Sequence, residues 1–431
     1  MTASPGEPVS DIADPGLSEA GRARIEWAQR GMPVLRLLAR RFGQARPFTG
    51  CTLAACLHVT AETAGLVTAL RAGGARVFLA ASNPLSTQDD VAAALAASGA
   101  ATVFARAGVD PAGYGEHIHR ALDSQPDLVV DDGGDLVNTL HAQRPELLSG
   151  VRGGCESTAT GVIRLRRMAE EGALAFPMVA TDATVTKQMF DNTRGTGQSV
   201  IDGVLRATNT LLDGRVVVVA GYGACGRGIA DAARGLGARV IVTEVDPVRA
   251  LDAVLAGFDV LPMAVAAPAG EVLITATGSR DVIGAELLPV LRDGAILANA
   301  GHFDVEIDTR ALAAEAVKVT REVRPHTDEY LLADGRRLLL LAEGRVVNLV
   351  AAEGHPPEVM DLAFGIEALA LAWLAGAVSG NTGDKLQVGV HEVPADIDAE
   401  AARLVLAAAG TSIDTLTAAQ RAYLESWRIG S

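Results

Sequence analysis

Lysine is rare in this chain, and one lysine stands near a carboxylate at helical spacing. The sequence holds 37 Lys and Arg residues, of which only Lys187, Lys318 and Lys385 are lysine. Arginine stays protonated in proteins, whereas a lysine releases its proton when its surroundings lower its pKa. Asp191 follows Lys187 by four residues and would share a helix face with it. The pair predicts a proton-transfer unit for an alcohol that is oxidised beside a cofactor, and the alternative is a solvated ion pair.

A glycine-rich turn in mid-chain predicts a dinucleotide site. The segment Gly221-Tyr-Gly-Ala-Cys-Gly226 follows an apolar run typical of a buried strand. Gly221 allows a tight turn, Gly223 lets the backbone approach a pyrophosphate, and Gly226 lets the next helix pack close to the sheet. Glu244 ends the following apolar run, where a carboxylate accepts from a ribose 2′-hydroxyl and repels a 2′-phosphate. We therefore expect NAD rather than NADP; the alternative is a glycine-rich turn without a ligand.

Three further polar clusters are candidates for proton transfer. His58 precedes Thr60 and Glu62, and Asp131-Asp-Gly-Gly-Asp135 follows another short apolar run. His302 and His355 each follow a glycine, which favours exposure to a crevice, and neutral histidine exchanges protons near pH 7. Each cluster alone is equally compatible with a structural role. The aspartates have carboxylates suited to a metal, but no matching carboxylate set occurs elsewhere, so no metal site is expected.

The elements that would position these residues alternate between strand and helix. Helical periodicity covers 17–42, 61–72 and 201–212, and the segments expected as strands are 52–58, 75–80, 128–131, 216–220, 238–243, 271–277 and 295–300. Alternating β and α segments predict an α/β fold with doubly wound parallel sheets. Polar residues at the ends of such strands, including Thr277 and Asn299, would point into one crevice, because ligands bind outside the carboxyl ends of the strands.

Length and composition limit the possible classes of function. A chain of 431 residues exceeds one hydrophobic core and predicts at least two domains. A net charge of −15 argues against nucleic acid as a partner. Four cysteines without metal-ligand or secreted-disulfide spacing favour a reducing cytoplasm. Residues 1–16 carry acidic residues and are expected to be a flexible tail rather than a signal peptide, and the apolar stretch 362–378 contains Glu367 and predicts a buried helix rather than a membrane span.

Together these segments resemble the S-adenosylhomocysteine hydrolase (adenosylhomocysteinase) family, over nearly the whole chain from about Pro47. The resemblance rests on Cys56-Leu-His58, Asn83 to Asp89, Asp131 to Asp135, Lys187 to Asn192, Gly221 to Gly226, Gly301 to Asp308, Leu341 to Arg345 and Gly354-His-Pro356. It implies a Rossmann NAD-binding domain (193–353) inserted in a split α/β substrate domain (17–192 plus 354–390), a C-terminal helical segment (391–431) and a homotetramer. The chain's end is similar to that of the shorter bacterial and archaeal members, which lack a tail reaching into a neighbour's NAD site.

The resemblance also implies roles for residues at matching positions. NAD takes a hydride from the ribose 3′-hydroxyl, the resulting 3′-ketone acidifies C4′, a group leaves from C5′, and the hydride is returned. The residues implied for catalysis are His58, Asp132, Lys187, Asp191, Asn192 and His302. Those implied for the nucleoside substrate are Thr60, Gln88, Ser157, His355, Met360 and Phe364. Those implied for NAD are Thr158, Thr160, Gly221, Gly223, Cys225, Gly226, Glu244, Thr277, Asn299 and Asn348.

The chain departs from the family pattern where sugar and cofactor meet. The family's Glu-Glu-Thr-Thr-Thr-Gly becomes Glu156-Ser-Thr-Ala-Thr-Gly161, so the second Glu, which grips the ribose, is Ser157. Asp182 stands where the family usually has Asn, and the usual Asn-Gln pair is Ile366-Glu367. Loss of one charge-assisted hydrogen bond weakens binding of adenosine by about tenfold to a hundredfold.

These departures predict a divergent paralogue. Our leading hypothesis is an NAD-dependent nucleoside dehydratase that eliminates water across C4′ and C5′ of an adenine nucleoside, as in nucleoside antibiotic biosynthesis. One alternative is an authentic hydrolase that yields adenosine and homocysteine. Another is an inactive NAD-binding regulator, although Lys187, Asp191 and His58 are all present.

Overall fold

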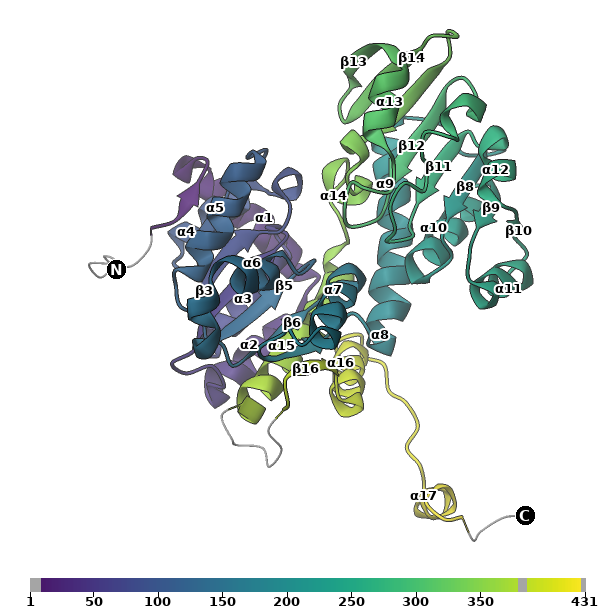
Figure 1. Ribbon diagram of the computed structural model, residues 1–431. Helices are drawn as coiled ribbons and strands as arrows, with labels where there is room; N and C mark the ends of the chain where they lie inside the picture. The colour runs from purple at the N-terminus through teal and green to yellow at the C-terminus, as the bar shows by residue number, and fades with distance from the viewer. Residues whose placement is uncertain (1–8, 379–385, 428–431) are drawn as a thin grey trace.

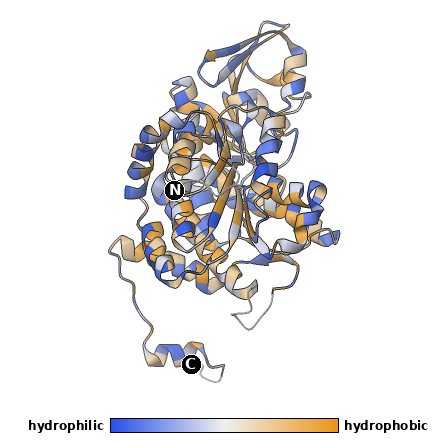
Figure 2. Ribbon diagram, turned by 90° about the vertical axis from the view of Figure 1, so that its left-hand side faces the viewer, coloured by the Kyte–Doolittle hydropathy of each residue, from blue (hydrophilic) through white to orange (hydrophobic). Residues whose placement is uncertain are grey.

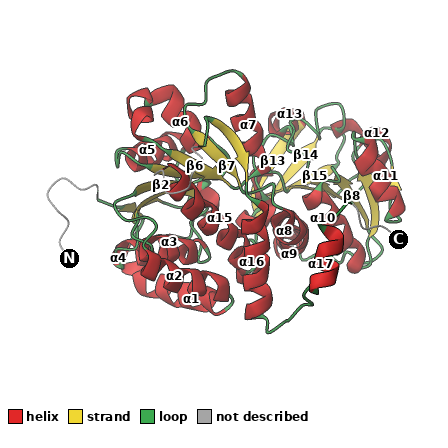
Figure 3. Cartoon of the chain, turned by 90° about the horizontal axis from the view of Figure 1, so that it is seen from below, coloured by secondary structure: helices red, strands yellow, loops and turns green. Residues whose placement is uncertain are grey.

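The computed structural model describes residues 9–378 and 386–427. Figure 1 shows two sheet regions next to each other, with α8 (Val185–Lys187) and α14 (Val347–Val350) between them. In Figure 3 helices flank the strands of both regions. The doubly wound α/β architecture expected from the sequence is confirmed.

The first sheet is parallel throughout and is covered by helices on both faces. Its strand order is β1-β4-β3-β2-β5-β6-β7-β16. The strands are β1 (Asp11–Ile12), β2 (Thr52–Leu57), β3 (Arg76–Ala81), β4 (Thr102–Ala105), β5 (Leu128–Asp131), β6 (Gly153–Glu156), β7 (Pro177–Ala180) and β16 (Gly389–Glu392).

Alternate residues of β2 show how both faces are buried. Leu53 and Leu57 lie in a core with α1 (Ser18–Arg30), α2 (Pro33–Ala45), α3 (Thr63–Ala72), α4 (Asp89–Ala97) and α15 (Pro357–Val378). Ala54 and Cys56 point the other way, into a core with α5 (Pro111–Leu122), α6 (Asp135–Gln143) and α7 (Ala159–Glu170). This two-sided burial explains why the strands are apolar without alternation. Figure 2 shows the hydrophobic colour concentrated in the strands.

The second sheet carries the glycine-rich turn. Its order is β10-β9-β8-β11-β12-β15-β14-β13, and it is parallel except for β13 and β14, which form an antiparallel extension beyond β15. The strands are β8 (Val216–Ala220), β9 (Arg239–Thr243), β10 (Asp259–Val260), β11 (Val272–Thr275), β12 (Ala295–Asn299), β13 (Ala316–Arg324), β14 (Thr327–Leu332) and β15 (Arg337–Leu341). One face packs on α9 (Thr196–Thr208) and α10 (Ala224–Gly235), and the other on α12 (Met263–Ala266) and α13 (Thr309–Glu315); α11 (Pro247–Leu255) follows β9.

The chain leaves the first sheet after β7 and returns to it through α15. Strand β16 pairs with β7 and completes the first sheet, so the domain with the second sheet is inserted in a split α/β domain. The predicted limit at residue 390 falls inside β16, so the return to the first sheet extends to Glu392. The other domain limits stay a prediction.

Near the N-terminus the structure differs from two expectations. Residues 11–12, which we expected in a flexible tail, form the edge strand β1, because the Asp11 carboxylate accepts hydrogen bonds from Arg106 and Arg120. The helical stretch 17–42 is two helices, since Pro33 cannot continue α1 and instead starts α2.

Near the C-terminus one long apolar helix is followed by an exposed segment. Helix α15 is long and apolar enough to cross a membrane by length and composition, but 72% of its most apolar window is buried inside the protein, as expected for a core helix. After α16 (Ala395–Ala408), α17 (Ala418–Leu424) stands apart from the rest of the molecule in Figures 1 and 2.

Candidate active site

Lys187 lies at the start of a wide helical turn, within reach of two carboxylates. It ends α8 and is followed by the π-helix η4 (Gln188–Gly195), a form that occurs frequently at functional sites. Its Nζ lies 2.9 Å from Asp191 Oδ2 and 3.7 Å from Asp182 Oδ1. It also donates to the carbonyl oxygen of Ser157 at 2.9 Å. The ion pair is therefore buried and not solvated, with 8% and 7% of the Lys187 and Asp191 side chains exposed.

The carboxylate neighbours of Lys187 keep its side chain charged. Burial alone lowers the pKa of Lys187, but the charges of Asp191 and Asp182 outweigh burial and hold that pKa well above its usual value. Burial likewise raises the pKa of Asp191, and the charges of Lys187 and His355 reverse that effect and hold it below its usual value. Lys187 is therefore an ammonium donor in this structure, not a free amine. The sequence spacing reveals its neighbour Asp191 but not its second carboxylate neighbour, Asp182.

A hydrogen-bonded network extends this pair to His355, just before α15, and to Thr196 at the start of α9. His355 Nδ1 lies 2.6 Å from Asp191 Oδ1, and its Nε2 lies 3.2 Å from Thr196 Oγ1. Asn192 Nδ2 donates to Asp182 Oδ1 at 2.9 Å. Asp191 thus connects Lys187 to His355, and the aspartate at 182 has both Lys187 and Asn192 as neighbours.

The two histidines predicted for proton transfer come together from different domains. The rings of His58 and His302 are 6.0 Å apart, and the His302 ring lies against Gly133, where any Cβ would overlap it. His58 Nδ1 lies 2.7 Å from Ser86 Oγ. Burial lowers the pKa of His58 to about 4, against the opposing charge of Asp132. Neutral His58 is therefore available as a proton acceptor at pH 7.

Two buried carboxyl groups lie side by side in a pairing that sequence reasoning missed. Asp131 and Glu156 are register partners on β5 and β6, and both are fully buried. Burial raises the pKa of Glu156 to about 8, and burial with the charge of Glu156 raises that of Asp131. Asp132 follows Asp131 and accepts a hydrogen bond from Ser157 Oγ. No local pattern links these residues, because the contact comes from the pairing of two strands.

The Asp131 to Asp135 segment binds protein groups. Asp131 Oδ2 accepts from the backbone N–H of Val137 at 2.8 Å, and Asp135 accepts from Tyr114 and Arg164. Among the residues that the structure describes, no cluster of His, Cys, Asp or Glu is arranged to hold a metal ion.

The glycine-rich turn has the backbone geometry that a dinucleotide needs. Gly221 has φ +93, and a Cβ there would lie 2.7 Å from the Ala276 carbonyl oxygen. A Cβ at Gly226 would overlap the Gly221 carbonyl oxygen, so α10 packs directly on the turn. A Cβ at Gly223 would meet only the Arg249 guanidinium, at 3.5 Å, which leaves the backbone open to a ligand. The residues therefore fit the dinucleotide.

Two polar side chains, Glu244 after β9 and Asn348 on α14, also fit NAD. Glu244 is held by three backbone N–H groups, from Tyr222 at 2.7 Å, Val245 at 2.7 Å and Asp246 at 3.0 Å. Asn348 donates to Ser199, while its buried Oδ1 has no hydrogen-bond partner among the described residues. An unpaired buried acceptor is what a carboxamide donor of a bound nicotinamide would satisfy.

Three other residues predicted for NAD are engaged within the protein. Asn299 makes hydrogen bonds through both ends of its amide, including Nδ2 to the Gly344 carbonyl oxygen at 2.9 Å. Thr277 donates to the buried carboxylate of Glu306 at 2.7 Å. Thr158 caps α7 and donates to Glu156 at 2.7 Å. These residues shape the loops of the crevice, and Thr160 is half-buried in the first turn of α7.

The residues predicted for the substrate lie around the same edge of the first sheet. Thr60 is buried, and Gln88 Oε1 accepts from the Ala61 N–H at 3.1 Å. Met360 and Phe364 are on α15 and pack against the core shared with β2. They border the side of β6 where Ser157 follows.

The two halves of the site meet where α10 begins. A Cβ at Gly228 of α10 would overlap the Thr193 carbonyl oxygen of η4, so the two helices are in backbone contact. Cys225 hydrogen-bonds with Thr196, and the charges of Asp191, Asp182 and Lys187 act on its thiol; burial is the main reason its pKa rises to about 11. The first turn of the dinucleotide helix is therefore next to the Lys187 network.

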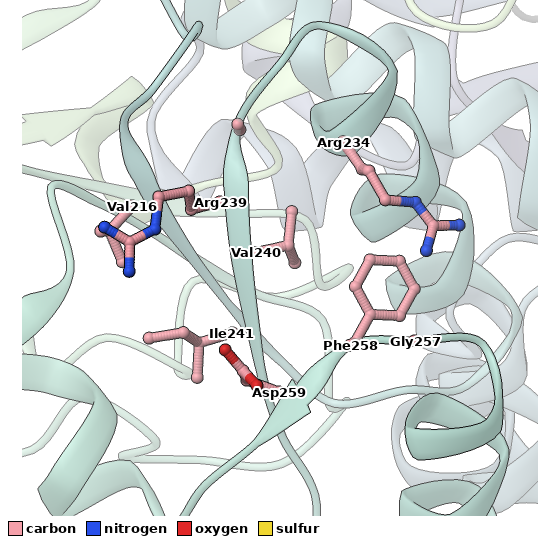
Figure 4. A pocket seen from close by; sticks show the side chains of 9 residues that line it. Val216, Arg234, Arg239, Val240, Ile241, Gly257, Phe258 and Asp259 are labelled. Atoms are coloured by element: carbon pink, nitrogen blue, oxygen red, sulfur yellow. The ribbon is translucent and has the colours of Figure 1, made fainter.

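Two cavities lie at opposite ends of the sheets. A cleft of about 220 Å³ opens between the domains and is lined by Asn83, Tyr114, His302, Phe303, Glu343 and Arg345, among others. The second, about 270 Å³, is bordered by Val216, Arg239 and Phe258 at the amino ends of β8 and β9 (Figure 4). Ligands of open α/β sheets bind at the carboxyl ends, so the interdomain cleft is the route to the site.

Comparison with known proteins gives matches over most of the chain. Residues 192–354 match the model described as S-adenosyl-L-homocysteine hydrolase, NAD binding domain, and residues 9–147 match the model described as S-adenosyl-L-homocysteine hydrolase. The adenosylhomocysteinase of Aquifex aeolicus is 53% identical over 421 residues, covering 98% of this chain and 99% of that protein. The adenosylhomocysteinase of Nostoc sp. is 50% identical and covers 100% of both chains, and that of Saccharolobus solfataricus is 51% identical over 97% of this chain and 99% of that protein.

Proposed function

Because the chain belongs to the S-adenosyl-L-homocysteine hydrolase family, as an NAD-dependent enzyme, we propose that it hydrolyses S-adenosyl-L-homocysteine to adenosine and homocysteine. The observation that carries the proposal is the contact between the two halves of the site. Cys225 of the dinucleotide helix lies beside the Lys187 network, so a nicotinamide and a sugar hydroxyl would share one place. The full-length relatives named adenosylhomocysteinase favour this reaction over the dehydratase that was our leading hypothesis.

The charges at the site support alcohol chemistry on a ribose. NAD, when bound, supplies the acceptor and later the donor of a hydride. The Lys187 ammonium would bind the 3′-oxygen as a hydrogen-bond donor, and Asp191 would link it to His355 for transfer of the hydroxyl proton. Neutral His58 and the nearby Asp132 would accept and return protons at C4′ and C5′.

A second candidate, the nucleoside dehydratase, is favoured by one local observation. Ser157 is short, and its hydroxyl is already bonded to Asp132, so the strand end offers no carboxylate to a ribose hydroxyl at this position. Such a site suits a nucleoside that carries an extra substituent on its sugar, from which water would leave.

Mass spectrometry of the products separates these candidates. Purified protein with NAD would be incubated with S-adenosylhomocysteine and, in parallel, with hydroxymethyl-bearing adenine nucleosides. Release of adenosine and homocysteine supports the hydrolase. Loss of one water from a nucleoside, without cleavage of the thioether, would replace it with the dehydratase. If no candidate nucleoside reduces bound NAD, both enzymes are excluded and the inactive regulator is favoured.

The assembly and location of the protein are also proposals. Exposed apolar side chains near the C-terminus, Ile413, Leu416 and Leu424, support association with further copies, and we expect the tetramer. Light scattering of the purified protein tests this state. The four cysteines are free thiols, which supports the reducing cytoplasm.

A further inference from the structure

Glu367 is a buried carboxyl group without a hydrogen-bond partner. It lies on α15, is 1% exposed, and receives no hydrogen bond at either oxygen from any residue that the structure describes. A buried acceptor that is left unpaired costs about 1–3 kcal/mol, and more when it is charged. Packing does not call for a carboxyl group here, since its helix neighbours Ile366 and Ala368 are fully buried apolar residues. The group therefore needs a partner other than the residues that the structure describes.

The packing of α15 on β6 places Glu367 at the level of the reactive end of the strand. A Cβ on Gly153 would lie 3.1 Å from Leu374 Cδ1, so these residues face each other. Glu367 precedes Leu374 by two helical turns and lies about 10 Å along the same helix face. Glu156 follows Gly153 by three residues, also about 10 Å along the strand.

The direction of α15 brings the carboxyl group to the crevice and not to the far end of the sheet. Near the start of the helix, Val359 Cγ1 would lie 2.8 Å from a Cβ on Gly195, the last residue of the η4 helix that begins after Lys187. The helix therefore runs antiparallel to β6, and Glu367 lies between the Lys187 turn and the middle of the strand.

Alternation along β6 brings Ser157 to the same gap. Cys155 lies in the core that contains Leu374, so the side chain two residues later points to the α15 side. The charges that act on Glu367 are those of Asp132, Lys187 and Glu156, all at the site. Burial and the two neighbouring carboxylates raise the pKa of Glu367, whereas Lys187 lowers it.

We propose that Glu367 is a specificity-determining residue whose carboxyl group hydrogen-bonds a hydroxyl group of the nucleoside sugar. This inference rests on the proposed function, because it takes a nucleoside as the ligand. A hydroxyl group both donates and accepts, so it pairs with a carboxyl group in either protonation state. An ammonium ion would pair with the ionised form alone. With Ser157 bonded to Asp132, α15 supplies a carboxyl group to the gap where position 157 has none.

The test measures binding of nucleosides to the NAD-loaded protein by calorimetry. Glu367→Met keeps about the length of the side chain and removes both oxygen atoms, whereas an amide would still hydrogen-bond a hydroxyl group. We expect the Kd for adenosine to rise tenfold to a hundredfold. One of 2′-deoxyadenosine and 3′-deoxyadenosine lacks the hydroxyl group that Glu367 contacts, and the Kd for that nucleoside should change less than twofold. The matched control is Glu358→Met, at an exposed glutamate in the first turn of the same helix, which should leave all three values unchanged.

Two further results decide the outcome. Because Glu367 is unpaired in the free protein, the apolar variant Glu367→Met should raise the thermal midpoint while it weakens binding, which a merely structural carboxyl group would not do. If adenosine and both deoxynucleosides weaken equally, or none changes, the role of Glu367 is overturned while the proposed function stands. If the unaltered protein binds none of the three nucleosides, the proposed function itself fails.

Discussion

The two walls of the crevice recognise their ligands by different means. On the side of the first sheet the reactive positions are side chains, among them Lys187, His58 and Glu156, whose protonation depends on burial and on one another. On the side of the second sheet the decisive positions are glycines, where the backbone itself must approach the ligand. The difference predicts that substitutions near the first sheet change the charge of the site and the pH dependence of the protein. Substitutions at the glycines of the second sheet should instead change the space available to the ligand.

The largest effect is expected at Gly226. It belongs, with Gly221 and Gly223, to the side of the crevice formed by the second sheet, which we call the glycine wall. An added methyl group would overlap the Gly221 carbonyl oxygen, so one of the two backbone segments would have to shift. Gly226→Ala should therefore abolish NAD binding and destabilise the protein by more than about 4 kcal/mol. NAD titration and thermal unfolding measure both. Gly235→Ala, at the other end of α10 with no atom within 4 Å of the added methyl, is the control. An unchanged Gly226→Ala protein would contradict the backbone contact.

On the side-chain wall the largest effect is expected at Lys187. Lys187→Met keeps the length of the side chain but leaves buried carboxylates without their ammonium partner, which destabilises by about 3–5 kcal/mol. Turnover should fall by about 10²–10⁴-fold with NAD still bound. Lys318→Met, on the exposed strand β13, removes the same charge as a control. Equal kinetics for the two variants would remove Lys187 from the chemistry.

A smaller effect on the side-chain wall is expected from His58, which makes the stability of the folded protein depend on pH. Its pKa is about 4 in the folded protein and about 6.5 when unfolded, so in this range the unfolded state binds more protons. Stability therefore falls as pH drops through this window. Between pH 7 and pH 5 the loss is about 2 kcal/mol, from about 1.4 kcal/mol per pKa unit.

His58→Asn should remove this part of the pH dependence. Chemical unfolding at both pH values, for the variant and the unaltered protein, measures the difference. The control is His326→Asn, at an exposed position with φ +60 that asparagine tolerates. The prediction is wrong if the two variants show the same slope of stability against pH.

The sequence reveals the glycine wall more completely than the side-chain wall. Gly221, Gly223 and Gly226 are local in sequence, and their spacing alone implies the close approaches that the structure shows. The contact between Lys187 and Asp191 is also local and forms even though the segment is a π-helix.

What sequence reasoning missed is non-local. Glu156 meets Asp131 through strand pairing, and Glu367 reaches the same place through the packing of a distant helix. The second carboxylate neighbour of Lys187 was missed for the same reason, since Asp182 lies just beyond the end of another strand. Charge effects sum over neighbours that a linear pattern does not reveal.

The smallest effect separates binding from folding on the glycine wall. A methyl group on Gly223 would have open space apart from the Arg249 guanidinium at 3.5 Å, and its φ of −70 suits alanine. Gly223→Ala should therefore fold with an unchanged thermal midpoint but bind NAD about tenfold more weakly, or by about 1.4 kcal/mol, because the methyl group occupies the approach of the pyrophosphate. Calorimetry against NAD, with Gly235→Ala again as the control, measures this loss. Should Gly223→Ala bind NAD normally, the dinucleotide does not approach the backbone at this turn. The two walls would then both depend on side chains.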